Sequence, residues 1–321
     1  MPGRRDSLLD TIRIRASVLK KTREFFDQRD FVEVTTPCLV AAPDPAVHLD
    51  SFETGVRMPG GEQRRLYLST SPEHHMKRLV AMGMERIYQL TPFFRDGEIT
   101  DLHNPEFLGL EWYETGASVE ECMQRTEQLV THVQPGLKSP FHRLTVLEAL
   151  RELGGVEVAG DFSNLGAAVA GAGIATDPAD GFDDLVNRVL IERVEPKLPG
   201  LGPVFLCDYP APMAALARLR PDRPQVAERF ELFAGGLELC NGYGELTDAS
   251  EQKERFLAQL QERRRLGKSV PPLDLAFVGA LEAGLPPCSG CALGMDRLVM
   301  LICGKKRLDE VMPFPLAGEL S

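Results

Sequence analysis

Two arginines that lie far apart in the sequence are the first candidates for chemistry. Arg95 follows two phenylalanines in "FFRDGE", Arg297 interrupts the apolar run "GCALGMDRLVML", and both lie close to glycine. A planar guanidinium donates two parallel hydrogen bonds to phosphate oxygens. The pair therefore indicates two clamps on one polyanion, although for either arginine alone a structural ion pair is the commoner explanation.

Two carboxylates suggest a place for a cation. Glu231 and Glu238 lie seven positions apart in "RFELFAGGLEL", on either side of Gly235-Gly236. If the two glycines form the turn of a hairpin, both carboxylates face one site and would hold Mg²⁺, which prefers oxygen ligands and phosphates. Two isolated carboxylates in such a strand would more often be surface residues.

The charge balance excludes some classes of function. The chain has 321 residues, a formal net charge of -11, 43% hydrophobic and 26% charged residues. A protein that grips a nucleic-acid backbone usually has a basic face, so broad nucleic-acid binding is not expected. The basic segment "ERRRLGK", residues 262–268, is interpreted as a solvated helix end that suits the helix dipole.

Neither a membrane segment nor a secretion signal is expected. No apolar run approaches the roughly 20 residues that a membrane helix needs. The N-terminus "MPGRRDSLLDTIRIR" lacks an apolar signal core and a cleavage site. A cytoplasmic protein without membrane contact is the prediction.

The cysteines give little sign of a disulfide or metal framework. Their number is odd, and most stand among apolar residues, which is typical of reduced core thiols. Cys288 and Cys291 form "CSGC", a weak zinc signal without a second cysteine pair or nearby histidines. The five expected core thiols are Cys38, Cys122, Cys207, Cys240 and Cys303.

The first half of the chain alternates helices and strands. An amphipathic helix is predicted over residues 7–29, followed by strands at "FVEV", "RLYLST" and "RIYQLT". Ser71 is predicted to cap a helix that has Pro72 at its first position and ends at Gly83. Two capping boxes are expected, at residues 118–121 and 145–148.

The second half begins with helical periodicity and then returns to strands. Helices are expected over residues 150–200 and 249–266. Strands are predicted at "PVFLCDYP", "QVAERFELFA", "GLELCNGY" and "CSGCALG", the last running into a helix that Gly304 ends. The hairpin-like spacings favour an α/β (α+β) fold with a mostly antiparallel sheet flanked by helices.

Three ordered stretches make a resemblance specific. "FFDQRDFVEVTTP", "FFRDGEITDLHNPEFLGLEWY" and "GCALGMDRLVML" resemble motifs 1, 2 and 3 of the class II aminoacyl-tRNA synthetases. "TSPEHHMKRL" and "LELCNGYGELTD" are similar to the lysyl branch of that class. The resemblance covers residues 10–304 and implies a catalytic core with a six- or seven-stranded sheet and a two-fold homodimer built on motif 1.

The resemblance implies the roles of the candidate residues. Arg95 would hold the α-phosphate of ATP and Arg297 the γ-phosphate end, as the catalytic pair, with Phe107 stacked on adenine and Mg²⁺ held by Glu231 and Glu238. The other implied ATP ligands are Asp96, Gly97, Glu98, His103, Asn104, Leu239 and Gly294. The implied amino-acid ligands are Ser71, Pro72, Glu73, Glu111, Tyr113, Asn241, Tyr243, Glu245 and Ala292.

Two positions depart from the lysyl-tRNA synthetases. Those enzymes read Arg-Asn-Glu in motif 2, where this chain has "RDGE", so Glu98 or Asp96 would meet adenine. They carry Gly at the position of Ala292, whereas the ligases of elongation factor P resemble this chain in having Ala. A methyl group at a pocket wall removes room, which is consistent with an amino group displaced from the α-carbon, as in β-lysine.

No stretch of the sequence matches the OB-fold domain with which lysyl-tRNA synthetases read the anticodon. A single catalytic domain over residues 1–321 is therefore expected, similar to the short lysyl-synthetase paralogues that ligate (R)-β-lysine or lysine to a lysine of elongation factor P. That resemblance implies an ATP-dependent ligase that binds no tRNA. A free-standing enzyme that charges tRNA or a small amine, and a non-catalytic regulator that binds lysine or ATP, remain alternatives.

Overall fold

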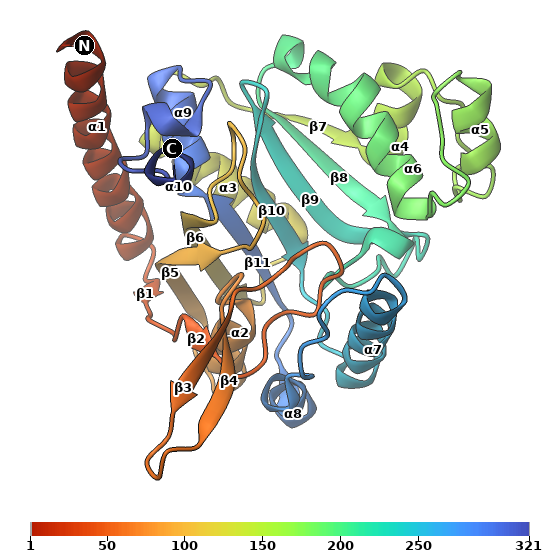
Figure 1. The fold of residues 1–321 in the computed structure, drawn as a ribbon. Helices are drawn as coiled ribbons and strands as arrows, with labels where there is room; N and C mark the ends of the chain where they lie inside the picture. Colours follow the sequence, from red (N-terminus) through yellow and green to blue (C-terminus); the bar gives the residue numbers. More distant parts are fainter. Residues whose placement is uncertain (1, 321) are drawn as a thin grey trace. The chain divides into compact units, whose positions relative to one another are not determined.

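The computed structural model describes residues 2–320, with side chains from residue 8 onward, and the chain groups into two compact units (Figure 1). Unit 1 comprises Met1–Ala117 and Thr247–Ser321, and unit 2 comprises Ser118–Leu246. Motifs 2 and 3 thus fall in unit 1, while Glu231 and Glu238 fall in unit 2. No helix within residues 2–320 has the length and apolar character to span a bilayer.

Unit 1 contains two sheets and most of the longer helices. Its helices are α1 (Pro2–Asp27), α2 (Glu73–Ala81), α7 (Ala249–Arg265), α8 (Leu275–Gly284), α9 (Met295–Cys303), η5 (Leu308–Glu310) and α10 (Leu316–Glu319). Its strands are β1 (Val32–Glu33), β2 (Leu39–Val40), β3 (Glu53–Arg57), β4 (Gln63–Leu68), β5 (Arg86–Phe94), β6 (Glu106–Thr115) and β11 (Cys288–Gly294).

The main sheet of unit 1 places motif 2 beside motif 3. Its order is β1-β5-β6-β11, with β1 parallel to β5 and the other two pairs antiparallel. A second sheet has the order β2-β4-β3, and its β3–β4 hairpin extends away from the main sheet of unit 1 (Figure 1). Motif 2 is the β5–β6 hairpin, so its loop and both strands are fixed by one continuous ladder of hydrogen bonds.

Aromatic packing joins α1 to the main sheet of unit 1. The ring of Phe26, fully buried near the end of α1, stacks on Tyr88 of β5 with 4.6 Å between centroids. It also lies 5.5 Å from the ring of Trp112 on β6. Burial of such rings supplies the largest packing contribution per residue. Motif 1 therefore anchors one face of the sheet and leaves the opposite face for the site.

Unit 2 contains a four-stranded sheet and a group of short helices. Its strands are β7 (His142–Thr145), β8 (Val204–Pro210), β9 (Val226–Ala234) and β10 (Leu237–Gly244). Its helical segments are α3 (Val119–Val133), α4 (Val146–Glu148), η1 (Ala149–Leu153), α5 (Leu165–Gly171), α6 (Phe182–Val189), η2 (Leu190–Val194), η3 (Glu195–Leu201) and η4 (Ala211–Met213). The order within this unit is β10-β9-β8-β7, antiparallel except for β7 with β8.

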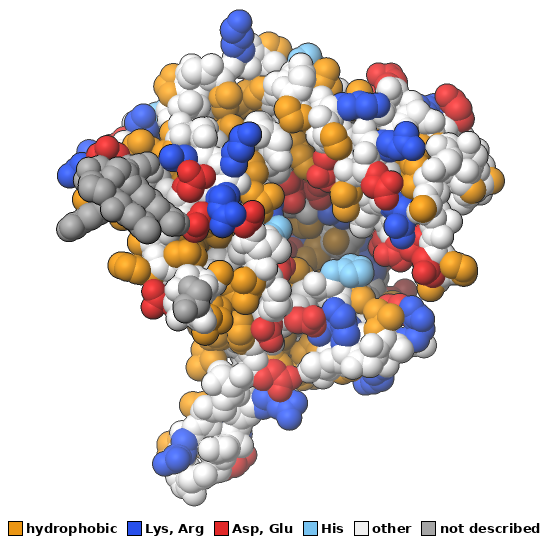
Figure 2. Space-filling model, turned by 45° about the horizontal axis from the view of Figure 1, so that its top comes forward, with side chains coloured by type: hydrophobic (Ala, Val, Ile, Leu, Met, Phe, Trp, Pro, Cys, Tyr) orange, Lys and Arg blue, Asp and Glu red, His pale blue; other side chains and the backbone are white. Residues whose placement is uncertain are grey.

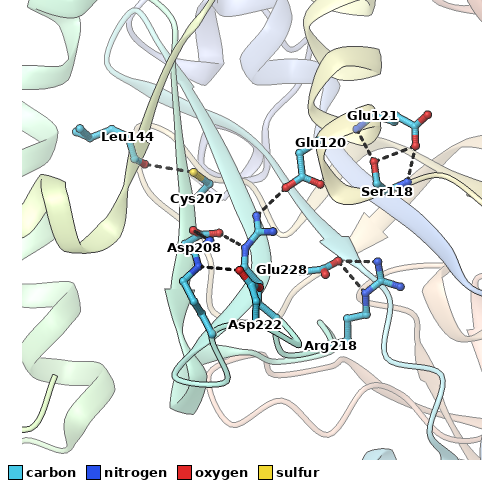
Figure 3. Close-up of polar contacts among 11 residues, drawn as sticks. Ser118, Glu120, Glu121, Leu144, Cys207, Asp208, Arg218, Asp222 and Glu228 are labelled. Carbon is cyan, nitrogen blue, oxygen red and sulfur yellow. Dashed lines mark hydrogen bonds and ion pairs between the residues drawn. The ribbon is translucent and has the colours of Figure 1, made fainter. Parts of the chain in front are cut away.

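Ion pairs hold the connection between β8 and β9. Asp208 accepts hydrogen bonds from Arg220 at 2.5 Å and pairs with Arg223 at 2.8 Å, and Arg220 also bonds Glu120 of α3 (Figure 3). Asp208 itself has a φ of 55°, at an irregularity in the pairing of β8 with β9. The paired arginines fix this connection against the sheet that carries the two metal-ligand candidates.

The predicted elements are largely confirmed. Both capping boxes form, Gly83, Gly267 and Gly304 follow their helices with positive φ, and the strands and long helix of the second half lie as expected. The strands of the two main sheets number eight in all, four in each unit. The expected number of six or seven strands was therefore too low. The single catalytic domain stays a prediction.

The basic segment at the end of α7, residues 262–268, is solvated only in part. Arg263 is buried, not solvated: it donates to the carbonyls of Ala46 and Leu49 and pairs with Asp50 at 2.6 Å. It ties the loop before β3 to α7. On the face shown in Figure 2, Lys and Arg side chains are interspersed with Asp and Glu.

Gly109 of β6 is required by its neighbour on β5. A Cβ atom at this position would lie 2.4 Å from the ring of Phe93, which is buried. Gly109→Ala is therefore expected to reduce the free energy of unfolding by about 1–3 kcal/mol, the usual cost of overpacking. Urea unfolding measures the change.

Gly55→Ala is the matched control, because Gly55 is an exposed strand residue of β3 with no atom within 4 Å of an added Cβ. Equal stability of the two variants would contradict the packing argument.

Candidate active site

A buried carboxylate lies on the face of β6 that points away from α1. Because side chains alternate along a strand, Phe107, Gly109, Glu111 and Tyr113 share one face. Glu111 is only 1% exposed. It accepts hydrogen bonds from the Ser71 hydroxyl at 2.7 Å and from the Tyr113 hydroxyl at 2.6 Å. The Glu111 carboxylate therefore joins two other residues, Ser71 and Tyr113, that are predicted to bind the amino acid.

Small residues of β11 lie opposite this carboxylate and its neighbours on β6. Ala292 lies directly opposite Glu111, and Gly290 and Gly294 lie opposite Tyr113 and Gly109. Directly paired residues of antiparallel strands point to the same face. The face of β11 that adjoins Glu111 thus carries one methyl group between two glycines. The contact of Ala292 with the amino acid stays a prediction.

The start of α2 supplies a second carboxylate. Ser71 was predicted to cap a helix beginning at Pro72, but the helix begins at Glu73 and Pro72 occupies the cap position. The Ser71 hydroxyl still accepts a hydrogen bond from the Glu73 amide at 3.1 Å while it donates to Glu111. This hydroxyl therefore links the helix start to the strand. Glu73 in turn pairs with Lys77, one turn further along α2.

The environment of Glu111 favours its protonated form. Burial, followed by the charge of Glu73, raises the pKa of Glu111 to about 8, although the hydroxyls of Tyr113 and Ser71 and the charge of Lys77 oppose the rise. A carboxyl group with such a pKa holds its proton at neutral pH and releases it when a cation arrives. This wall of unit 1 is therefore suited to an ammonium group.

The motif 2 loop brings a cation over an aromatic ring. The guanidinium carbon of Arg95 lies 5.1 Å from the centroid of Phe107, and Glu98 lies 3.8 Å from the Arg95 side chain. Gly97 has a φ of 80°, so it provides the left-handed turn between them. The Nε atom of Arg95 is buried without a hydrogen-bond partner among the described residues. Arg95 therefore keeps a donor for an incoming anion.

The second arginine contacts the same loop. An Nη atom of Arg297 on α9 lies 2.6 Å from Nε2 of His103, whose Nδ1 lies 2.8 Å from the Thr100 hydroxyl. A guanidinium group only donates hydrogen bonds, so Nε2 of His103 must accept and carry no proton. The ring is then neutral, with its proton on Nδ1. Motifs 2 and 3 thus meet through His103, and their common role with ATP stays a prediction.

Asp296 positions the helix that carries Arg297. It is buried, accepts a hydrogen bond from the Leu108 amide at 2.8 Å and pairs with Arg15 of α1. Gly294 occupies the N-terminal cap position of α9. The start of α9 is therefore tied to β6 and α1. The sequence carries no local signal for these contacts, because the partners lie far from Asp296 along the chain.

Asn104 serves the fold in the described structure. Its amide nitrogen donates to the carbonyl of Glu106 at 2.6 Å, and its oxygen accepts from the Leu316 amide at 2.9 Å. The amide of Asp96 likewise bonds the carbonyl of Asp50 at 2.7 Å. Contacts of the Asn104 and Asp96 side chains with ATP stay predictions.

Two strand irregularities align the polar residues of unit 2. The pairing of β9 with β8 shifts around Asp208, and its pairing with β10 shifts at Leu239. Each inserts one residue, which reverses the alternation beyond it. Tyr209 of β8 and Glu238 of β10 consequently lie on the same face of the sheet as Glu231 of β9. The sequence predicted the hairpin but not these bulges.

Glu231 is the centre of this polar group. The Tyr209 hydroxyl donates to it at 2.6 Å, Arg229 at 2.7 Å and the Asn241 amide at 3.3 Å. Burial first, and then the charge of Glu238, raise the pKa of Glu231. The two glutamates therefore act on each other, as expected if they face one site.

The donor set of unit 2 fits Mg²⁺ better than a transition metal. Within residues 2–320 no group of three or more His, Cys, Asp and Glu side chains gathers to hold a metal. Glu231 and Glu238 supply two carboxylates, which are oxygen ligands but too few to enclose an ion. Mg²⁺ commonly keeps other positions for water and phosphate oxygens. Glu231 and Glu238 would thus hold it only together with a nucleotide.

The end of β10 carries the remaining amino-acid candidates. Glu245 is fully buried, and Tyr243 lies opposite Arg229. A Cβ atom on Gly244 would lie 2.1 Å from a carboxylate oxygen of Glu228, which Arg218 fixes at 2.7 Å (Figure 3). Gly244 therefore allows the strand to lie directly over Glu228. Binding of substrate by Tyr243 and Glu245 stays a prediction.

The cysteines do not form a site. None of the seven takes part in a disulfide bond. Cys288 and Cys291 are buried on β11 three residues apart, so their side chains leave opposite faces of the strand. The described geometry gives "CSGC" a packing role.

Four residues of the site were missed in the sequence: Lys77, Tyr209, Arg229 and Asp296. Lys77 stands four positions after Glu73 on a helix, which is a recognisable spacing for an ion pair. The other three have no local signal, because bulges and contacts with distant segments place them.

Comparison with known proteins identifies the fold family. The family model described as tRNA synthetases class II (D, K and N) matches residues 1–318. An elongation factor P–(R)-β-lysine ligase of Vibrio cholerae is 39% identical over 311 residues, which cover 96% of this chain and 95% of the relative. Ligases of the same name from Hamiltonella defensa (40% identical, 94% of each chain) and Salmonella arizonae (39% identical, 94% and 93%) are similarly close.

The raised pKa of Glu111 predicts how stability depends on pH. The folded protein keeps the Glu111 proton up to about pH 8, whereas the ordinary pKa of a glutamate carboxyl group is 4.5. Unfolding between these values releases a proton, so the wild-type protein loses up to about 1.4 kcal/mol for each pH unit. Glu111→Gln removes this loss, and its stability relative to wild type is expected to increase from pH 5 to pH 9.

Urea unfolding at several pH values measures this difference. Glu254→Gln, which changes an exposed carboxylate of α7, is the control and should not show the trend. A Glu111→Gln difference that stays constant with pH would contradict the assignment.

Proposed function

The chain belongs to the class II tRNA synthetases, and we propose that it is an ATP-dependent ligase that joins (R)-β-lysine to a lysine side chain of elongation factor P. The observation that carries the proposal is the buried Glu111, held by Ser71 and Tyr113 opposite Ala292. A buried carboxyl group with a raised pKa selects a substrate that brings a cation. The acceptor is proposed from the names of relatives that match nearly the whole chain.

The first step forms an adenylate. The carboxylate of the amino acid attacks the α-phosphorus of ATP, a P–O bond forms, and pyrophosphate leaves. Arg95 would stabilise the charge that develops on the α-phosphate, because its Nε–H is buried and has no hydrogen-bond partner among the described residues. Arg297 would exchange His103 for the terminal phosphate, and Phe107 would stack on adenine. Glu98 would contact the adenine edge.

Mg²⁺ would be held by Glu231 and Glu238 together with phosphate oxygens, where it would offset the charge of the triphosphate. The residues of the chain contribute chiefly by positioning and charge, so no covalent enzyme intermediate is required. Asn241, Tyr243 and Glu245 would complete the recognition of the amino acid.

The second step transfers the aminoacyl group. The ε-amine of the acceptor lysine attacks the carbonyl carbon of the mixed anhydride, an amide C–N bond forms, and AMP leaves with the bonding electrons. Loss of the amine proton completes the reaction. The same proposal includes a two-fold homodimer through α1 and β1, a single catalytic domain, action in the cytoplasm and no tRNA substrate.

Incubation with ATP, labelled (R)-β-lysine or lysine, and either elongation factor P or tRNA tests the proposal. Label is expected on elongation factor P, and more from (R)-β-lysine than from lysine because of Ala292. Label on tRNA alone, or on neither macromolecule, would refute the assignment of the acceptor.

Arg95→Ala is expected to reduce amino-acid-dependent ATP–pyrophosphate exchange by about 10²-fold or more, the scale for one lost charge stabiliser. Arg86→Ala is the matched control, because Arg86 lies at the other end of β5 in an ion pair with Glu114. It should leave the exchange rate near that of wild type. A normal rate for Arg95→Ala would show that another group stabilises the α-phosphate.

A further inference from the structure

Lys77 is a buried cation without a role in the reaction described above. Its side chain is 0% exposed, on the inner face of α2. Lysine is among the residues least often fully buried, since an ammonium group loses its hydration there. A fully buried lysine beside a substrate wall therefore requires an explanation.

Its contacts are the groups of the amino-acid wall. Lys77 pairs with Glu73, and its Nζ atom lies 5.9 Å from the centroid of the Tyr113 ring. Its charge also acts on Glu111, which Tyr113 contacts directly. One cation thus adjoins both carboxylates and the phenol that connects to one of them.

The stability of α2 does not explain this arrangement. An exposed pair four positions apart on a helix contributes only about 0.3–0.5 kcal/mol. Burial of an ion pair costs desolvation, so apolar residues of similar volume are often as stable or more so. Met76 and Val80 already provide apolar packing on the buried face of α2. A methionine at position 77 would serve the fold as well.

We infer that Lys77 is a built-in counter-ion of the amino-acid wall, a positioning residue that lets Glu111 give up its proton beside the Glu73 carboxylate when a substrate ammonium group arrives. The two carboxylates and Lys77 then leave one negative charge for one ammonium group of the substrate. The inference rests on the proposed function, because it assigns the charge that this wall presents to the amino acid. Without Lys77, the charge of Glu73 would act on Glu111 without an opposing cation from α2, and Glu111 would keep its proton to a higher pH.

The neighbours of Glu111 on α2, β5, β6 and β11 are consistent with this role. From α2 it faces Glu73 and Lys77, and on β6 it bonds the Tyr113 phenol. Its direct partners on β5 and β11, Gln89 and Ala292, carry no charge. Lys77 therefore supplies the positive charge that acts on Glu111 from α2.

The pH dependence of amino-acid activation tests the inference. ATP–pyrophosphate exchange with (R)-β-lysine between pH 6 and pH 9 gives kcat/KM for the amino acid, which is expected to rise as Glu111 loses its proton. Lys77→Met removes the cation and should move the midpoint of this rise upward by about one pH unit. The KM for ATP should not change.

Two further variants separate charge from structure. Lys77→Met/Glu73→Gln removes the attracting and the repelling charge together, so its midpoint should return to the wild-type value or below. Arg78→Met removes a cation from the same helix next to Lys77 and should leave the midpoint unchanged.

The outcomes distinguish this inference from the proposed function. If Lys77→Met lowers kcat/KM equally at every pH, or if the double variant keeps the high midpoint, Lys77 is only a packing residue and the inference fails. If the wild-type protein itself shows no exchange with (R)-β-lysine or lysine, the proposed function fails first.

Discussion

A carboxyl group buried in the middle of a sheet is the constraint on which the site depends. Glu111 lies on the central strand of the unit 1 sheet and is almost inaccessible to solvent. Such a group is stable only with hydrogen-bond donors or a proton. Ser71 and Tyr113 supply the donors, and the small residue Ala292 lies opposite it on β11. The fold thus keeps a proton on Glu111, and the ammonium group of a substrate would replace that proton.

The same physical problem recurs in unit 2 with a different solution. Glu231 is surrounded by Tyr209, Arg229 and Asn241, and Glu238 acts on it through its charge. Two strand irregularities are needed to bring these residues to one face. In unit 1 a proton or an ammonium group balances the carboxylate, whereas in unit 2 an arginine already does so in part. This difference is consistent with an amine ligand in the first case and a metal–nucleotide ligand in the second.

The sequence predicted the elements and the motif residues, because apolar periodicity, caps and glycine turns are local signals. It also predicted that Glu111, Ser71 and Tyr113 belong together, through family resemblance. It did not predict the bulges at Asp208 and Leu239, the link of Asp296 to Arg15, or the burial of Lys77 and Arg263. These features arise from strand register and from contacts between segments distant in the sequence, which single-residue preferences do not encode.

Proton release on binding of the amino acid tests the central claim most directly. Titration calorimetry with (R)-β-lysine at pH 7, in phosphate and in Tris, separates the proton count from the binding enthalpy because the two buffers differ in ionisation enthalpy. With a Glu111 pKa of about 8, close to one proton should leave the protein at pH 7 and almost none above pH 9. Equal enthalpies in both buffers at pH 7 would contradict a protonated Glu111 as the group that receives the ammonium.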